Sequence, residues 1–327
     1  MEKVDFVSIG DTVVDDFIKL KEAEAHCDIN NENCTICMRF GDKIPFESST
    51  VVYGVGNAAN AAVAAARLGL KTAYISNIGK DDRAERILER FKEEGVDATH
   101  VVEHAGIPTN YHYVLWFGTE RTILVKHQHY PYIFPPDAPA AKTVYLSSLA
   151  DGTETYHDAI AAYLEANPET FFAFQPGTFQ IQMGPQRLGR LYARCNFFVC
   201  NKEEAARILG MAVGTETLEL AKKLHALGPK IVMITDGVKG VDAFENGTFF
   251  HVPMFPDPKP PFQRTGAGDA FASTTVAYLT MGMPLKDAAL RGTINSAYVV
   301  QKIGAQAGLL KKDELENILA HTDHAKT

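Results

Sequence analysis

The sequence has few cysteines and no long apolar run. Five cysteines among 327 residues are too few, and an odd number, for a protein built on a disulfide framework. Such a cysteine content suits a reducing compartment. No uninterrupted apolar run reaches the roughly 20 residues that a membrane-spanning helix requires, not even in the alanine-rich stretch near residue 60. We therefore expect a cytoplasmic protein with no membrane partner.

A basic surface is missing as well. The chain has 32 lysines and arginines against 40 aspartates and glutamates, a formal net charge of −8, and its basic residues are scattered. Binding to nucleic acid needs clustered positive charge that neutralises the phosphate backbone, so nucleic acid is not expected as a partner. The first ten residues contain two acidic residues and no signal-peptide pattern, and they predict a first strand.

Short runs of apolar and β-branched residues alternate along the chain with amphipathic helical patterns that end at glycine. This alternation predicts an α/β layered fold with a mainly parallel central sheet. The predicted strands are Val4–Ile9, Thr72–Asn77, Thr143–Leu146, Thr170–Phe174, Phe197–Cys200 and Ile231–Thr235, and the helices include Arg83–Glu94, Lys202–Leu209 and Leu218–Leu227.

Two segments, 21–52 and 109–126, interrupt this alternation. In the second, two β-rich runs flank Gly118-Thr119-Glu120, which is typical of a β-hairpin. Strands inserted between βα units predict a small extra sheet, placed as a lid beside the crevice at the end of the main sheet. The core then comprises residues 1–20, 53–108 and 127–327.

The strongest local signal is Arg264-Thr-Gly-Ala-Gly-Asp269, a glycine-rich turn that opens a helix. Backbone amides at Gly266, Ala267 and Gly268, together with the helix N-terminus, favour a bound anion such as a phosphoryl group. A carboxylate at Asp269 then has two interpretations. It is either the general base that takes a proton from an attacking hydroxyl, or an acidic residue that complements the helix dipole.

Three known patterns for nucleotide chemistry are absent. The chain has neither the P-loop pattern Gly-x4-Gly-Lys-Ser/Thr nor the His-Arg-Asp loop of protein kinases. It also lacks Gly-x-Gly-x-x-Gly after the first strand, which argues against a dinucleotide-dependent oxidoreductase.

The sequence instead resembles the PfkB, or ribokinase-like, family of carbohydrate kinases over nearly its whole length. Thr265–Asp269 is similar to the carboxy-terminal signature of that family, and Gly54-Val-Gly-Asn-Ala-Ala-Asn60 is similar to its amino-terminal signature. The resemblance implies a three-layer α/β/α sandwich with a β-sheet lid. It also implies Mg²⁺-dependent transfer of phosphate from ATP to a hydroxyl of a sugar or sugar-containing metabolite.

The resemblance also implies roles for residues at the acceptor. Asp269 becomes the general base, with Gly266, Ala267 and Gly268 as the anion hole. Asp15, Gly56 and Asn60 become substrate-binding residues. From the residues alone, Asp15 is equally an exposed loop acid, and Asn57 a helix cap in front of an alanine-rich packing helix.

A second set of residues is implied for the nucleotide. Asn201 and Glu204 resemble an Asn-x-x-Glu motif that positions Mg²⁺ and the phosphates through water, although Asn201 also suits a helix cap. Thr235, Gly237 and Gly240 resemble the nucleotide loop, where an ordinary turn would use the same glycines. Two residues fall where the family lines the adenine pocket, Asn295 and Gly304.

Departures from the family pattern include two positions just before the carboxy-terminal signature. Gln263 and Arg264 stand where the family commonly has Asp and Thr, and that aspartate helps to hold an activating monovalent cation. The departure weakens the expectation of activation by K⁺. Arg264 is always charged and suits phosphate, so we expect it near the transferring group or an acidic substrate. Arg121, in the predicted hairpin, is a further candidate for binding substrate.

Three cysteines gather in the first lid segment. Cys27, Cys34 and Cys37 are either ligands of a structural zinc or plain thiols, since a full zinc site usually has a second Cys-x-x-Cys pair.

Two other functions and one assembly stay open. The first alternative is an adenosine-like nucleoside kinase, for which aromatic residues of the lid would stack on a base; the candidates are Tyr53, Tyr111, Tyr113 and Trp116. The second is a non-catalytic sugar- or nucleotide-sensing homologue. An exposed edge of the lid sheet would favour a homodimer formed through the lid.

Overall fold

A nine-stranded sheet forms the centre of the molecule. The computed structural model describes residues 3–27, 34–118 and 120–322. The strand order is β15-β14-β13-β12-β11-β10-β1-β6-β7, and all neighbours are parallel except the antiparallel pairs that β14 makes with β13 and β15. The strands are β1 (Val4–Ile9), β6 (Thr72–Gly79), β7 (Val96–His104), β10 (Ala141–Leu146), β11 (Phe171–Phe174), β12 (Phe197–Asn201), β13 (Ile231–Thr235), β14 (Val241–Glu245) and β15 (Thr248–Val252).

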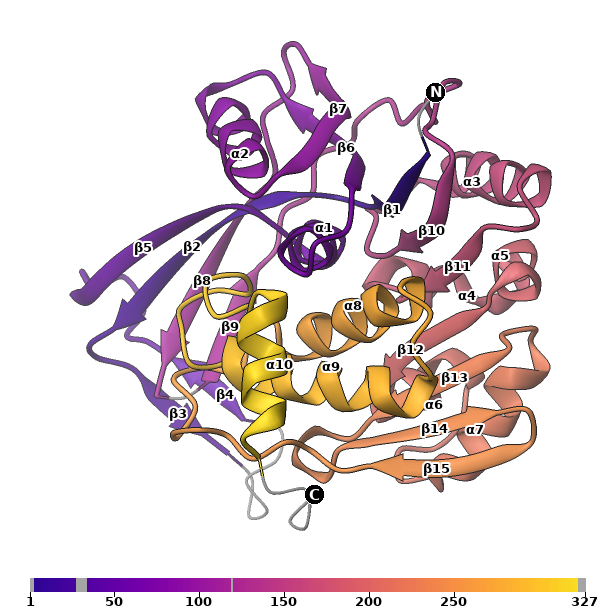
Figure 1. Cartoon of the computed structure of the whole chain (residues 1–327). Helices are drawn as coiled ribbons and strands as arrows, with labels where there is room; N and C mark the ends of the chain where they lie inside the picture. Colours follow the sequence, from indigo (N-terminus) through magenta and orange to yellow (C-terminus); the bar gives the residue numbers. More distant parts are fainter. Residues whose placement is uncertain (1–2, 28–33, 119, 323–327) are drawn as a thin grey trace.

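Helices cover both faces of this sheet (Figure 1). One face carries α1 (Asn57–Arg67), α2 (Asp82–Glu93), α8 (Ala267–Thr280), α9 (Leu285–Val299) and α10 (Lys312–Ala320). The other carries α3 (Glu154–Ala166), α4 (Thr178–Arg187), α5 (Gly189–Arg194), α6 (Lys202–Leu209) and α7 (Thr217–Ala226). In β1, Phe6 packs into the first layer and Val7 into the second, because successive strand side chains point to opposite faces. The predicted three-layer architecture is confirmed.

A second sheet, which we call the lid, projects from one edge of the main sheet (Figure 1). Its order is β5-β2-β8-β9, with bounds Phe46–Val55, Val13–Leu20, Tyr111–Phe117 and Glu120–Leu124. The predicted hairpin is confirmed as β8 and β9. The sequence assigned β2 to the core, whereas the structure has it in the lid, between β5 and β8. Its buried Val14 and Phe17 look like core residues in the sequence, and its partners are remote in the chain.

The inner face of the lid lies against the core. Trp116 of β8 packs edge-on against Phe262, with ring centroids 4.9 Å apart. Val52 of β5 lies close to Gly304, where an added Cβ would come within 3.5 Å of it. The lid therefore covers the loops that surround the amino terminus of α8.

The cysteine cluster takes a different form from either sequence-based interpretation. Cys27 and Cys34 form a disulfide beside the short hairpin of β3 (Glu24–His26) and β4 (Thr35–Cys37), and Cys37 is an exposed thiol. The zinc site predicted from these residues is not formed, because two of its three sulfurs are bonded to each other. Among the residues that the structure describes, no three His, Cys, Asp or Glu side chains are grouped to hold a metal ion, and no helix is long and apolar enough to cross a bilayer.

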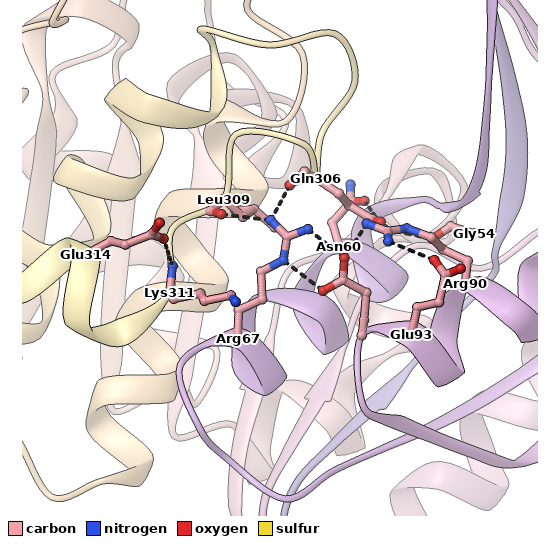
Figure 2. A network of polar contacts seen from close by, with 10 residues as sticks. Gly54, Asn60, Arg67, Arg90, Glu93, Gln306, Leu309, Lys311 and Glu314 are labelled. Carbon is pink, nitrogen blue, oxygen red and sulfur yellow. Dashed lines mark hydrogen bonds and ion pairs between the residues drawn. The ribbon is translucent and has the colours of Figure 1, made fainter.

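Arg67, in the last turn of α1, fastens the loop between α9 and α10 to the core (Figure 2). Its guanidinium donates to the carbonyls of Gln306 and Leu309, both at 2.7 Å, and forms a two-bond pair with Glu94 at 2.6 and 2.8 Å. Burial opposes ionisation of Glu94, but hydrogen bonds and charge from Arg67 and Arg90 hold its pKa below the usual value. The loop that carries Gln306 is thus tied to α1.

We expect Arg67→Met to destabilise the protein by about 3 kcal/mol, because it removes several charge-assisted hydrogen bonds from groups that are largely buried. Arg187→Met is the matched control, since Arg187 makes a similar two-bond pair with Asp158 on the surface and should barely move the unfolding midpoint. Urea unfolding of both variants measures this. Equal midpoints would show that the Arg67 network does not fasten the loop.

Candidate active site

Five parallel strands end at one cavity of about 560 Å³. This is the edge at which α/β sheets bind ligands, because the carboxyl ends of the strands and the amino ends of the following helices meet there. Residues at the ends of the strands line it: Asp11 after β1, Ser148 after β10, Gln175 after β11, Asn201 in β12 and Thr235 in β13. The lid contributes Asp15, His112 and Arg121, α1 contributes Asn57 and Asn60, and the turn 264–269 closes the remaining side.

The glycine turn before α8 requires glycine at its centre. Gly266 has φ 80°, and an added Cβ would lie 2.5 Å from the Cβ of Ala305, so a side chain is excluded twice over. Helix α8 begins at Ala267, and the amides of its first turn have no carbonyl one turn earlier in the helix to which they can donate. The turn thus supplies hydrogen-bond donors and the positive end of a helix dipole to an anion.

Asp269 sits in this first turn and faces the cavity. Its Oδ2 accepts a hydrogen bond from Asn60 Nδ2 at 2.8 Å, and its Oδ1 accepts one from Gln175 Nε2 at 3.0 Å. Burial raises the pKa of Asp269 above the usual carboxyl value, against the opposing effect of the two amides and of the Arg121 charge. Two donors orient the carboxylate while burial makes it a stronger base, as general-base chemistry requires.

Gln306, in the loop between α9 and α10, hydrogen-bonds to the Asn60 side chain (Figure 2). Gln306 Nε2 donates to the side-chain oxygen of Asn60 at 3.1 Å and to the carbonyl of Gly54 at 2.7 Å. The Asn60 amide is thereby turned with its NH₂ group toward Asp269. Gly56 lets the chain enter α1 with φ 114°, where an added Cβ would come within 2.9 Å of the Asp11 carbonyl. The alternative of a helix cap at Asn57 is wrong, because α1 has no side-chain cap.

Two carboxylates line the cavity away from Asp269. Asp15 lies 3.4 Å from Nδ1 of His112, its neighbour across the β2–β8 pair. Asp11 accepts hydrogen bonds from the Tyr132 hydroxyl and the Ala150 amide, both at 2.8 Å, and lies 3.3 Å from His127 Nδ1. Buried atoms without a hydrogen-bond partner here include Asp15 Oδ1, His112 Nε2 and His127 Nδ1. Such orphaned donors and acceptors suit a ligand that carries several hydroxyl groups.

A second cavity of about 240 Å³ adjoins the first across the glycine turn. The two share Thr235, Arg264, Ala267 and Gly268. The second is otherwise mainly apolar, and it is lined by Gly237, Gly240, Val241, Met254, Asp257, Phe271, Thr293, Ser296, Ala297 and Val300. A molecule that spans both cavities would place an apolar ring system in the second and its anionic part over the turn.

Asn201 and Glu204 form a reciprocal capping box at the start of α6. The Glu204 amide donates to Asn201 Oδ1 at 2.8 Å, and the Asn201 amide donates to Glu204 Oε2 at 2.9 Å. Both residues also line the first cavity. Burial raises the pKa of Glu204, and the nearby charge of Asp269 acts in the same direction. Helix capping and a place in the cavity therefore coexist in these two residues.

Two predicted nucleotide-site residues lie elsewhere. Asn295 is fully buried, donates to Thr274 Oγ1 at 2.7 Å and accepts from the Leu310 amide at 2.9 Å. Other positions of α9 face the cavity, at helical spacing: Thr293, Ser296, Ala297 and Val300. Gly304 lies beneath Val52 of the lid, while its neighbour Ala305 lines the first cavity.

Sequence reasoning missed Asp11 and Gln175. Both come directly after the carboxyl end of a parallel strand, which was the available signal. Gln175 orients Asp269 and accepts a hydrogen bond from the Tyr145 hydroxyl. Asp15 and Asn60, which line the same cavity, were predicted from the family resemblance. No signature motif of the family covers residue 175.

Known kinases are similar to this chain in sequence. A ribokinase from Haemophilus influenzae is 27% identical over 293 residues, which cover 86% of this chain and 92% of that protein. A bifunctional ribokinase/ribose-5-phosphate isomerase A from Fructilactobacillus sanfranciscensis is 25% identical over 311 residues, and the chain spans only 53% of its length.

Solved structures share the fold. Ribokinase from Arabidopsis thaliana, determined with ribose and ATP, matches with TM-score 0.81 and 18% identity, covering 98% of this chain and 100% of that one. A nucleoside kinase from Methanocaldococcus jannaschii matches with TM-score 0.80 and 20% identity, covering 98% and 99%. The family model for pfkB family carbohydrate kinases matches residues 16–312, nearly the whole chain. With its glycine turn, its aspartate and its two adjoining cavities, the chain belongs to the pfkB family of carbohydrate kinases.

Proposed function

We propose that the protein transfers the γ-phosphoryl group of ATP to a hydroxyl group of a sugar or sugar-containing metabolite, with Asp269 as the general base. The observation that carries this proposal is the position of Asp269. Its carboxylate is oriented by Asn60 and Gln175 in the first turn of α8, where the two cavities meet. A base is then available beside a site that suits a phosphoryl group.

In the proposed reaction the acceptor lies in the first cavity and the nucleotide in the second. Asp15, Gly56 and Asn60 bind the acceptor, and Thr235, Gly237 and Gly240 border the nucleotide. The acceptor oxygen attacks the γ-phosphorus and its proton passes to Asp269, while the bond from phosphorus to the bridging oxygen breaks and ADP leaves. The amides of Gly266, Ala267 and Gly268 stabilise charge on the phosphoryl oxygens.

Mg²⁺ fits the donors near the turn. Magnesium prefers oxygen ligands, keeps several waters and usually binds through one or two carboxylates together with substrate phosphates. Glu204 supplies a carboxylate and Asn201 an amide oxygen on the wall of the first cavity, so these residues would hold the hydrated ion. The ion would neutralise charge on the phosphates as they react.

A nucleoside acceptor is the second candidate function. The lid aromatics chosen for stacking have other partners, because Tyr111 lies under Arg83 and Trp116 packs on Phe262. The observation in favour is Phe179, which lines the first cavity and stacks edge-on with His127 at 5.6 Å. The sensing alternative is disfavoured, because Asn60 and Gln175 orient the carboxylate of Asp269 beside the anion-binding turn, which is the arrangement that a general base requires.

A homodimer through the lid is part of the proposal. The outer strand β5 exposes Phe46 and Val51, and Leu124 and Val125 are exposed at the opposite edge. Apolar side chains along unpaired strand edges favour association with a second sheet.

The direct test measures ATP consumption across a panel of free sugars, sugar phosphates and nucleosides with Mg²⁺. One compound should drive turnover, and Asp269→Asn should lower kcat by about 10²–10⁴-fold, because the base is lost. ATP binding, followed by calorimetry, should persist. If no compound drives turnover although sugar and ATP bind, the kinase proposal fails and the sensing alternative replaces it.

The raised pKa of Asp269 leads to a pH-dependence. Because the base acts deprotonated, kcat/KM should fall with decreasing pH along a limb that lies above the ordinary aspartate pKa of about 3.9. The amide of Gln175 lowers the pKa of Asp269, so Gln175→Leu should move this limb to higher pH. A pH–rate profile of both proteins measures the shift. A limb that stays in place or moves to lower pH would exclude the proposed role of Gln175.

We also expect turnover that does not depend on K⁺. The Gln263 side chain is buried, donates to the Lys302 carbonyl at 3.1 Å and accepts from the Thr265 hydroxyl at 3.2 Å. A neutral amide thus occupies the position where the family commonly has a cation-binding aspartate. Initial rates in K⁺, Na⁺ and tetramethylammonium salts at equal ionic strength should agree. Strong activation by K⁺ alone would contradict this prediction.

A further inference from the structure

Arg121 is a cationic side chain of the lid, and none of the described residues forms a hydrogen bond or an ion pair with it. It is half-buried on the wall of the first cavity, and its Nε is buried without a hydrogen-bond partner. Among the residues that the structure describes, no carboxylate lies within ion-pair distance of it. Burial lowers the pKa of Arg121, against the more distant charges of Glu120, Asp269 and Asp15. A buried charge without a partner is costly, which indicates that an anionic ligand completes it.

The register of the lid strands indicates that Arg121 lies at the end of the first cavity that borders the glycine turn. In the β8–β9 pair, Arg121 lies opposite Trp116. Trp116 packs on Phe262, two residues before Arg264 and four before Gly266. Directly opposed residues of a sheet share a face, so Arg121 leaves the lid on the side that covers the glycine turn.

The other end of this lid segment lies beside Asp11 and Asp15, where the proposed acceptor binds. The chain leaves β9 at Leu124 and continues to His127, which lies 3.3 Å from Asp11. Asp15 lies at the same end, beside His112. An acceptor that carried a phosphate or carboxylate there would face the carboxylates of Asp11 and Asp15. Repulsion between like charges would disfavour binding of such an anion, so this end of the cavity suits an uncharged, hydroxyl-rich group.

From this arrangement we infer that Arg121 binds the transferring phosphoryl group of the nucleotide, from the side opposite the amides of the glycine turn. The inference rests on the proposed function and adds a catalytic residue to it. Arg121 stays protonated and takes no part in bond exchange. Its guanidinium neutralises the phosphoryl oxygens while the bond to the acceptor oxygen forms, the bond to ADP breaks and the proton goes to Asp269.

This role makes lid closure a condition for reaction. The turn and Asp269 belong to the core, whereas Arg121 belongs to β9. With the lid displaced, the phosphoryl group would keep its amide donors and lose the guanidinium. Transfer to water would then be slow in the open state, because the guanidinium reaches the phosphoryl group only when the lid is closed.

The test compares Arg121→Met with the matched control Lys126→Met, which removes the same charge from an exposed position just beyond β9. With the acceptor found in the panel, Arg121→Met should lower kcat by about 10³-fold or more. The acceptor KM should stay within about threefold, because the lost interaction is made with the transferring group. Arg121→Lys should recover part of kcat, and Lys126→Met should behave as the unchanged protein.

A second measurement needs no acceptor. Calorimetry with Mg²⁺ should show that the unchanged protein binds adenosine 5′-(β,γ-imido)triphosphate more tightly than ADP, and that Arg121→Met loses this preference. The melting temperature of Arg121→Met should not fall, since no residue in the described part of the chain bonds to this side chain. A structural role would lower it instead.

Three outcomes would overturn the inference. A raised acceptor KM with unchanged kcat would assign Arg121 to the acceptor, and a panel answered only by sugar phosphates or sugar acids would agree with that. A lower melting temperature would make it a structural residue. An unchanged preference for the triphosphate analogue would show that it does not meet the γ-phosphate. Absence of turnover in the unchanged protein would instead refute the kinase proposal, and the binding comparison would still decide the role of Arg121.

Discussion

The site depends on one electrostatic constraint, which is that a carboxylate must work beside a phosphoryl group of the same sign. In the proposed reaction Asp269 acts as a base where an anion binds, and two unscreened negative charges at that distance would repel each other. The structure places hydrogen-bond donors beside both the anion site and the carboxylate. The first turn of α8 presents amides and the positive end of a helix dipole, and Asn60 and Gln175 donate to the carboxylate itself. Most of the surrounding architecture serves to hold these donors in place.

The supports reach far from the reacting atoms. Gln306 donates to the side-chain oxygen of Asn60 and so favours the orientation in which Asn60 donates to Asp269, and Gln306 belongs to a loop that Arg67 fastens to α1. The close contact between Gly266 and Ala305 brings the same loop against the glycine turn. A single segment near the carboxyl end of the chain therefore orders both the base and the anion site. This explains why residues 304–309 have a tight, glycine-containing path although none of them is proposed to react.

The sequence predicts the main sheet well because buried parallel strands and glycine-capped helices have local signatures. The strand Val4–Ile9 and the helix Lys202–Leu209 agree with the structure residue for residue. Contacts between remote segments leave weaker traces. The side chain of Gln175 is polar and follows a strand, but only the folded chain shows that it meets Asp269. Asn295 was misplaced by less than one helical turn, since Ser296 and Thr293 face the cavity and Asn295 faces α8. The position of β2 depends on partners that are remote in sequence.

The departures from the family pattern act together. Gln263 removes a carboxylate from the vicinity of the glycine turn, and its neutral amide satisfies the Lys302 carbonyl. Arg264 adds a guanidinium on the border of both cavities. With Arg121 on the wall of the first cavity, two guanidinium groups border the region beside the glycine turn. We therefore expect this site to have less need of a bound monovalent cation, because positive charge belonging to the chain lies beside the anion-binding turn.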